Sequence, residues 1–178
     1  YGLGADGIAP TLTDAGAAGF GVATPSEANV LIKYRRPVIV LSSILPDEVP
    51  AMIEAGVELP ICDLDAAKKI NETAKKLKRR AKAHLKIDTG MGRLGMTAQQ
   101  ALDNAMSYLS LPWLDISAIA SHFPCADDPS DPVNMRQIES FRELSWKLGS
   151  AGFSFAERHI AASAALFNLP QSYRDPFN

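Results

Sequence analysis

The sequence predicts an α/β protein built as a parallel (β/α)8 barrel, a TIM-type barrel, of which about six β/α units are present. Three observations support this fold class. Short apolar runs alternate with longer amphipathic segments along the whole chain. Each run is continuously apolar, as in parallel strands that are covered on both faces. No glycine-rich phosphate fingerprint follows the first strand, which favours a barrel over a dinucleotide-binding sheet.

Apolar runs, helix caps and glycines set the expected boundaries of the elements. Thr24 and Glu27 have the spacing of a capping box, so a helix is expected to begin at Pro25, and Gly56 is expected to close the next helix. We expect strands at residues 20–24, 38–41, 59–62, 84–87, 116–121 and 157–161, and helices at residues 25–34, 46–55, 63–80, 97–109 and 134–151. About two of the eight barrel strands would then lie outside residues 1–178, which form a partial barrel domain.

The composition argues against several classes of function. Hydrophobic residues make up 47% of the 178 residues and charged residues 21%, as in an ordinary globular protein. The net charge of −2 gives no general attraction to nucleic acid or to a membrane surface, and no apolar run approaches the ~20 residues of a membrane span. Cys62 and Cys125 have no metal-ligand spacing, so we predict no metal site and a reducing, cytoplasmic setting. The basic run at residues 75–82 is expected to be a solvated helix end.

Polar residues and glycines gather in four segments at expected strand ends, where the functional groups of a parallel barrel cluster. These segments are residues 1–4, 86–95, 121–123 and 159–165. In the second segment, glycines surround Arg93, whose planar guanidinium suits an oxygen anion. The alternative is that Lys86 and Asp88 form a simple ion pair and the glycines only a turn. The residues alone leave both interpretations open.

His122 and Ser163 are each open to two interpretations. A single histidine after a strand, such as His122, is more often a satisfied core residue than a functional one. Ser163 stands before an alanine-rich segment, where it could cap a helix or hold a phosphate at the helix N-terminus.

Together, these segments resemble the alanine racemase family. Residues 86–95, KIDTGMGRLG, look like the signature of that family, and residues 121–127, SHFPCAD, are similar to its SHFxxAD segment. Residues 159–165, HIAASAA, are similar to its HxxNSAA segment, and the opening YGLGA to the end of its KAxAYGxGA motif. FGVAT at residues 20–24, followed by Glu and Ala at positions 27 and 28, also fits. The main matches keep the family's order and cover essentially the whole chain.

The resemblance implies a pyridoxal 5′-phosphate enzyme, an isomerase that interconverts L-alanine and D-alanine and supplies D-alanine for peptidoglycan. It also implies a cytoplasmic homodimer with shared active sites. Arg93 would donate to the phenolic oxygen of the cofactor, and His122 would pack against its pyridine ring. Tyr1 and Ser163 would hold its phosphate, and Leu41 would touch it.

The resemblance places no proton-transfer group in this chain. The catalytic lysine would lie just before Tyr1, and the catalytic tyrosine would lie in a C-terminal β-domain that residues 1–178 do not include. The chain alone is therefore expected to be inactive. His159 would belong to the network that orients this tyrosine, which the other subunit contributes. Lys86 would carry a carbamate that braces Arg93.

Departures from the family pattern keep other functions open. Ala162 stands where the family usually has asparagine, and Leu3 where many members have histidine. Loss of the asparagine amide beside Ser163 gives weight to a broad-specificity or serine racemase of the same family. A third possibility is a non-catalytic barrel protein that binds pyridoxal phosphate and has no β-domain. The sequence after residue 178 would discriminate between these functions.

Overall fold

Parallel strands and helices alternate along the whole chain. The computed structural model describes residues 4–174 and residue 177, so Tyr1, a predicted phosphate ligand, lies outside the described residues. The elements are α1 (Ala5–Asp14), β1 (Phe20–Val22), α2 (Pro25–Leu31), the 3-10 helix η1 (Ile32–Tyr34), β2 (Val38–Val40), α3 (Val49–Ala55), β3 (Leu59–Ile61), α4 (Leu64–Leu77), β4 (Ala81–Lys86), α5 (Ala98–Asp103), α6 (Ala105–Leu109), β5 (Leu114–Ala120), α7 (Pro132–Ser150), β6 (Glu157–His159), α8 (Ser163–Asn168) and the 3-10 helix η2 (Pro170–Ser172).

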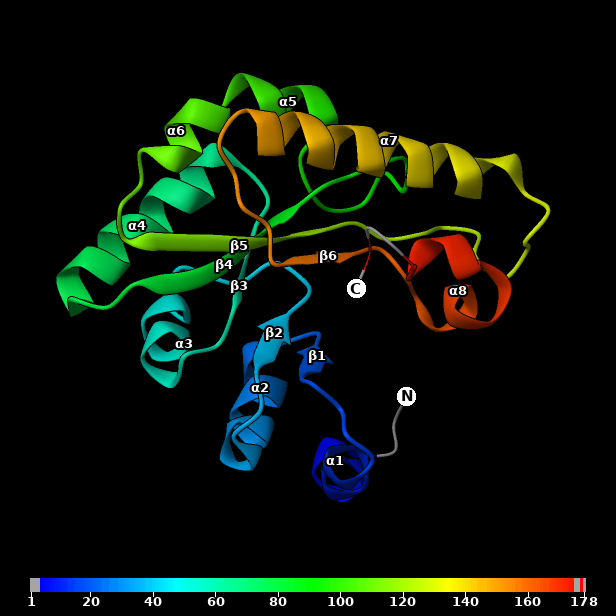
Figure 1. The fold of residues 1–178 in the computed structure, drawn as a ribbon. Coiled ribbons are helices and arrows are strands. Elements are labelled where there is room, and N and C mark those ends of the chain that lie inside the picture. Colours follow the sequence, from blue (N-terminus) through cyan, green and yellow to red (C-terminus); the bar gives the residue numbers. More distant parts are fainter. Residues whose placement is uncertain (1–3, 175–176, 178) are drawn as a thin grey trace.

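The strands lie side by side in chain order. β1 pairs with β2, and β3, β4, β5 and β6 form a second sheet in that order, with every pairing parallel. An isolated parallel bridge between Ile39 and Glu58 joins the two sheets. Helices α4, α5, α6 and α7 lie together on one side of the four-stranded sheet (Figure 1). This arrangement confirms the predicted α/β class with parallel strands, as an incomplete barrel.

Local chemistry explains where helix α2 begins. The Thr24 side chain accepts a hydrogen bond from the Glu27 amide, and the Glu27 carboxylate accepts one from the Thr24 amide. Pro25 occupies the first turn, where the missing N–H costs nothing. The capping box that the sequence predicts is therefore confirmed.

Two predicted helices end or break early because of local backbone preferences. Helix α4 ends at Leu77, before the predicted residue 80, since Lys78 adopts a left-handed conformation with φ of 53°. The single helix predicted at residues 97–109 is divided at Asn104. The Asn104 side-chain amide donates to the Gln100 carbonyl at 2.8 Å, so it competes with the helical backbone pattern.

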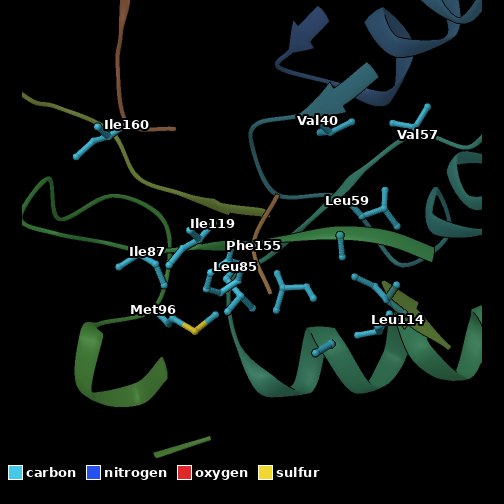
Figure 2. Close-up of a cluster of buried hydrophobic side chains, with 14 of the residues drawn as sticks. Val40, Val57, Leu59, Leu85, Ile87, Met96, Leu114, Ile119, Phe155 and Ile160 are labelled. Atoms are coloured by element: carbon cyan, nitrogen blue, oxygen red, sulfur yellow. The ribbon is translucent and has the colours of Figure 1, made fainter. Parts of the chain in front are cut away.

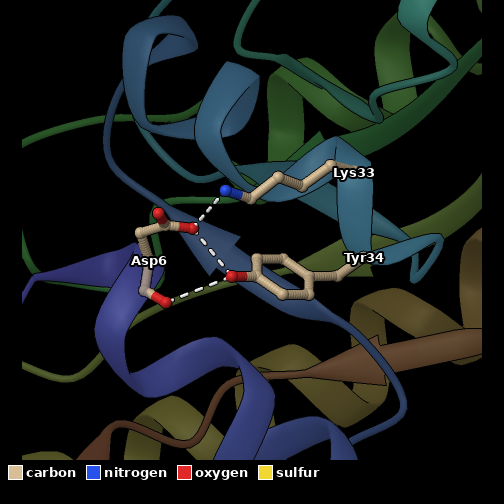
Figure 3. Close-up of polar contacts among 3 residues, drawn as sticks. All are labelled: Asp6, Lys33 and Tyr34. Carbon is tan, nitrogen blue, oxygen red and sulfur yellow. Dashed lines mark hydrogen bonds and ion pairs between the residues drawn. The ribbon is translucent and has the colours of Figure 1, made fainter.

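Helix α1 is an element that sequence reasoning missed. It contains Pro10, a residue that disfavours helix interiors, although Ala5, Ile8, Ala9 and Leu12 recur at helical spacing. It contacts both α2 and η1, the latter through polar side chains (Figure 3). The Asp6 carboxylate receives Lys33 Nζ at 2.5 Å and the Tyr34 hydroxyl at 2.7 Å. These three residues attach the start of α1 to the end of the following β/α unit.

The hydrophobic core extends from the two-stranded sheet through the four-stranded sheet and the helices that cover them (Figure 2). Leu59, Leu85 and Ile119 come from three neighbouring strands, and each is 0% exposed. Ile87 and Met96 extend this cluster beneath the loop that follows β4. Burying one such side chain contributes ~1.5–3 kcal/mol. The core therefore uses one face of the strands and leaves the other face for different side chains.

Candidate functional site

The predicted site residues on β4 and β6 lie in one row across the sheet. Neighbouring residues of a strand point to opposite faces, and paired residues of parallel strands share a face. Lys86 is paired with Ala120, and Ala120 is paired with His159. This row lies at the carboxyl ends of the strands, on the face opposite Leu85 and Ile119. We call this face the inner face.

Glycine allows the loop after β4 to fold back on its own strand. The Met96 amide donates to the Lys86 carbonyl at 2.9 Å, and the Asp88 amide donates to the Met96 carbonyl at 2.8 Å. Gly95 has a φ of 114°, and a Cβ at this position would lie 2.8 Å from the Lys86 carbonyl oxygen. A side chain at Gly95 would therefore clash with backbone. The closed loop presents Arg93 exposed to solvent.

Asp88 stabilises this loop instead of pairing with Lys86. Its Oδ1 accepts the amides of Gly90 at 2.8 Å and Gly92 at 3.1 Å. Burial raises the pKa of Asp88, but hydrogen bonds from backbone amides outweigh that effect and lower the pKa below its ordinary value. Within the described residues, the ion pairs include neither Lys86 nor Arg93. The alternative interpretation of a Lys86–Asp88 ion pair is therefore wrong.

Lys86 is a buried amine without an acidic partner nearby. Lys86 is 7% exposed, and its Nζ donates a hydrogen bond to the Ser121 carbonyl at 3.4 Å. Burial lowers the pKa of Lys86 and Arg93 lowers it further, while Cys62 acts in the opposite direction. Burial also raises the pKa of the Cys62 thiol to about 11, so this thiol is uncharged near neutral pH. The two basic side chains thus lie together without a compensating anion from the described residues.

His122 joins this pair from the loop after β5. Its side chain is half-buried, which does not match the interpretation as a satisfied core histidine. Burial lowers the pKa of His122, and the positive charges of Lys86 and Arg93 lower it further. The imidazole is therefore neutral near pH 7. Lys86, Arg93 and His122, here called the basic cluster, occupy one end of the sheet.

Gln137 is a site residue that sequence reasoning missed. It lies on α7 and is 1% exposed, and its Nε2 donates to Thr89 Oγ1 at 3.1 Å and to the His122 carbonyl at 3.3 Å. Thr89 shares a hydrogen bond of 2.7 Å with Ser121, whose hydroxyl also bonds the Ile87 carbonyl at 2.9 Å. One buried amide therefore ties the loop that carries Arg93 to the loop that carries His122. A polar residue on the apolar stripe of α7 was the available signal.

His159 lies on the inner face beside a second histidine that was also missed. The rings of His84 and His159 have centroids 6.0 Å apart. Burial lowers the pKa of His159 to about 4, and His84 and Lys86 lower it as well, against an opposing effect of Glu58. His159 is therefore neutral at physiological pH. Deeper in the fold, Glu58 Oε1 lies 3.2 Å from His84 Nδ1.

Leu41 and Ser163 follow strands β2 and β6 at the same end of the fold. Leu41 is 40% exposed and lies over Gly21, where a Cβ would come within 3.0 Å of Leu41 Cδ1. Ser163 is exposed and is the first residue of α8, whereas Ala162 is the N-cap and provides no side-chain hydrogen bond. The interpretation of Ser163 as the N-cap is therefore wrong. Its role toward a phosphate stays a prediction, as does the contact of Leu41.

Two further properties concern the described residues as a whole. Among residues 4–174 and 177, no group of histidine, cysteine, aspartate or glutamate side chains could hold a metal ion. In the same part of the chain, no helix is both long and apolar enough to cross a membrane.

Comparison with known proteins places this geometry in a family. The family model described as "Alanine racemase, N-terminal domain" matches residues 1–177. The alanine racemase of Desulforamulus reducens is 36% identical over 178 residues, covering 98% of this chain and 48% of that protein. The solved alanine racemase of Clostridium difficile 630 superimposes with a TM-score of 0.92 at 28% identity, over 97% of this chain and 48% of that one.

A second solved structure agrees. The alanine racemase of Streptomyces lavendulae, a D-cycloserine producer, has a TM-score of 0.88 at 29% identity, over 98% of this chain and 47% of that one. The chain thus spans about half the length of the relatives it matches. The family model, the sequence relatives and the superpositions agree with the motifs at the strand ends, and the chain belongs to the alanine racemase family.

Proposed function

We propose that the complete protein containing this chain is a pyridoxal 5′-phosphate-dependent alanine racemase that interconverts L-alanine and D-alanine and supplies D-alanine for peptidoglycan. The observation that carries the proposal is the basic cluster. Lys86, Arg93 and His122 converge at the carboxyl ends of the strands, and the nearby Asp88 carboxylate is bonded to its own loop. The permanently charged guanidinium of Arg93 suits an anionic ligand at this end of the sheet.

The residues present fit pyridoxal phosphate, which carries an anionic phosphate and a phenolic oxygen. Arg93 would donate to the phenolic oxygen, because a guanidinium stays charged and offers a planar pair of donors. The neutral His122 ring would pack against the pyridine ring. Ser163 would hold the phosphate together with Tyr1, and Leu41 would touch the cofactor. When bound, the cofactor supplies a conjugated ring that acidifies the Cα proton of the amino acid.

The described residues would position the cofactor, and none of them would transfer a proton. We infer that a lysine before Tyr1 and a tyrosine of a β-domain move the proton, the tyrosine coming from the second subunit of a homodimer. This inference is supported by the relatives, of which this chain covers 48% or less in the cases described. His159, which is neutral, would help to orient that tyrosine.

Lys86 fits a carbamate better than a free ammonium. Burial and the neighbouring Arg93 both lower the pKa of its amine, and a neutral amine can add carbon dioxide. The new N–C bond gives a carbamate anion and releases one proton to solvent. The anion would pair with Arg93 through charge-assisted hydrogen bonds and hold the guanidinium toward the cofactor.

A broad-specificity or serine racemase of the same family is the second candidate. The observation in its favour is Ala162, the N-cap of α8, which lacks the amide that the family usually has there. A smaller polar network beside Ser163 would alter how the site discriminates between substrates. The third candidate, a non-catalytic cofactor-binding barrel, would bind the cofactor without racemising any amino acid.

The test is racemisation by the complete protein loaded with pyridoxal phosphate, followed by circular dichroism with L-alanine and with L-serine. We expect alanine to be the preferred substrate by kcat/KM. Preference for serine would support the second candidate. Binding of the cofactor with no racemisation of any amino acid would contradict the proposed function and support the non-catalytic barrel.

A further inference from the structure

A buried contact between a carboxylate and an imidazole lies deeper inside the fold than the basic cluster. Glu58 Oε1 and His84 Nδ1 are 3.2 Å apart, with the His84 side chain 0% exposed and the Glu58 side chain 12% exposed. His84 is two residues before Lys86 on β4, so both side chains point to the inner face. Glu58 reaches this face from the residue before β3.

Small residues on the strand between them allow two histidines to meet. His84 of β4 is paired with Ala118 of β5, and Ala120 of β5 is paired with His159 of β6. Both alanines are buried and share the inner face with the histidines. Their methyl groups leave the space above β5 open, so the two imidazole rings lie 6.0 Å apart and are tilted by 56°. A larger side chain at either alanine position would separate them.

Several polar atoms of Glu58, His84 and His159 make no hydrogen bond within the described part of the chain. Glu58 Oε1, both ring nitrogens of His84 and Nε2 of His159 are buried and have no hydrogen-bond partner among the described residues. The Glu58–His84 contact is within ion-pair distance, but its direction does not meet hydrogen-bond geometry. Burial of such atoms is costly, and apolar side chains of similar volume would fill this space more favourably. The cost of burying these polar groups makes Glu58, His84 and His159 candidates for a functional role.

We propose that Glu58 is a positioning residue that acts through His84 on His159. This inference rests on the proposed function, in which His159 orients the catalytic tyrosine. A carboxylate oxygen 3.2 Å from Nδ1 electrostatically favours the tautomer of His84 with its proton on Nδ1, which leaves Nε2 as an acceptor. His84 in this tautomer then gives His159 one defined neighbour on the inner face.

Electrostatic interactions among Glu58, His84 and His159 support this indirect effect of Glu58 on His159. The titratable groups that act on His159 come from two neighbouring segments: Glu58 lies just before β3, and His84 and Lys86 lie on β4. Burial lowers the pKa of His159, as do His84 and Lys86, whereas Glu58 raises it. A change of charge at Glu58 or His84 would therefore change the electrostatic environment of His159.

The experiment replaces Glu58 with Gln in the complete protein, beside the control Glu54→Gln, a change at an exposed glutamate of α3. Nitrogen-15 NMR of the imidazoles reports the tautomers of His84 and His159 without any need for activity. We expect E58Q to convert His84 from one tautomer to a mixture and to change the His159 signal. We also expect kcat for alanine to fall by about tenfold with little change in KM, while E54Q behaves as wild type. The conservative E58D should restore part of both effects.

The outcomes separate this inference from the proposed function. Unchanged tautomers in both E58Q and E58D, or an unchanged kcat despite a tautomer change, would overturn the positioning role. If E58Q does not fold, E58D should show the same tautomer change to a smaller extent, and its absence would overturn the proposal. If the wild-type protein racemises no amino acid, the proposed function fails, and the NMR response of His159 to E58Q alone decides the coupling.

Discussion

Two rows of residues lie one position apart on the same strands but face opposite sides of the sheet, and they differ in polarity and in what they contact. The outer row contains Ile61, Leu85 and Ile119, each 0% exposed and packed under the helices. The next row on the inner face contains Lys86 and His159, with a small alanine between them. Because strand side chains alternate, a shift of one residue separates packing from chemistry. The comparison teaches that stability and function can be changed independently on the same strand.

The largest expected effect is on the outer row. Leu85→Ala should lower the free energy of unfolding by about 2–5 kcal/mol, because it opens a cavity in a fully buried cluster. Urea denaturation measures this loss, with the exposed Lys82→Ala on the same strand as the control. The folded variant should bind pyridoxal phosphate as wild type does. A loss below about 1 kcal/mol would contradict the division between the two rows.

On the inner row, low pH should lower the free energy of unfolding through protonation of His159. Its folded-state pKa of about 4 lies below the ordinary value of ~6.5, so the unfolded chain takes up the proton first as the pH falls. Above pH ~6.5, His159 is neutral in both the folded and the unfolded chain and does not change the stability. As the pH falls to ~4, protonation in the unfolded chain lowers the free energy of unfolding by up to about 3 kcal/mol. His159→Asn should therefore flatten the dependence of unfolding free energy on pH in this window. An unchanged slope would show that His159 titrates normally.

The inner row should also respond to loss of Lys86. Lys86→Ala in the complete protein should lower alanine racemisation by about tenfold, and added chloride or a small carboxylate should partly restore it by filling the anion position beside Arg93. Lys82→Ala serves as the control here too. Unchanged activity, or activity that no small anion rescues, would count against the carbamate.

The smallest expected effect lies just beyond the inner row, at the start of α8. Ala162→Asn supplies a favourable N-cap where the present residue makes no side-chain hydrogen bond. We expect a gain of about 0.5–1 kcal/mol in the free energy of unfolding, measured by denaturation. The ratio of kcat/KM for alanine over serine should rise if Ala162 broadens specificity. A destabilised variant would show that the cap is not open to asparagine.

Local patterns predicted much of the fold and of the basic cluster. The capping box at Thr24 and the glycines around Arg93 act within a few residues, so their consequences could be inferred from the sequence. Helix α1 contains Pro10, which argues against a helix, and it was missed although its apolar residues recur at helical spacing. Asp6 of α1 contacts Lys33 and Tyr34 of the following β/α unit, and no pattern within α1 predicts these contacts.

The missed site residues depend on strand register and on helix placement. Gln137 reaches the site only because α7 packs across the loops after β4 and β5. Glu58 and His84 meet His159 only because the register places alanines between the histidines. No spacing within the sequence expresses such contacts. A polar residue at a position where the pattern requires an apolar one was the only available signal.

The most direct test of the account is the affinity of the complete protein for pyridoxal phosphate after removal of Arg93. Arg93→Ala takes the permanent charge from the basic cluster, and Arg136→Ala, at an exposed position of α7, is the matched control. Titration of the cofactor, followed by absorbance, gives the dissociation constant of each variant. The account predicts at least about tenfold weaker binding for R93A, as expected for a lost charge-assisted contact, and wild-type binding for R136A. Equal affinity of R93A and R136A would contradict the assignment of the basic cluster as the cofactor site.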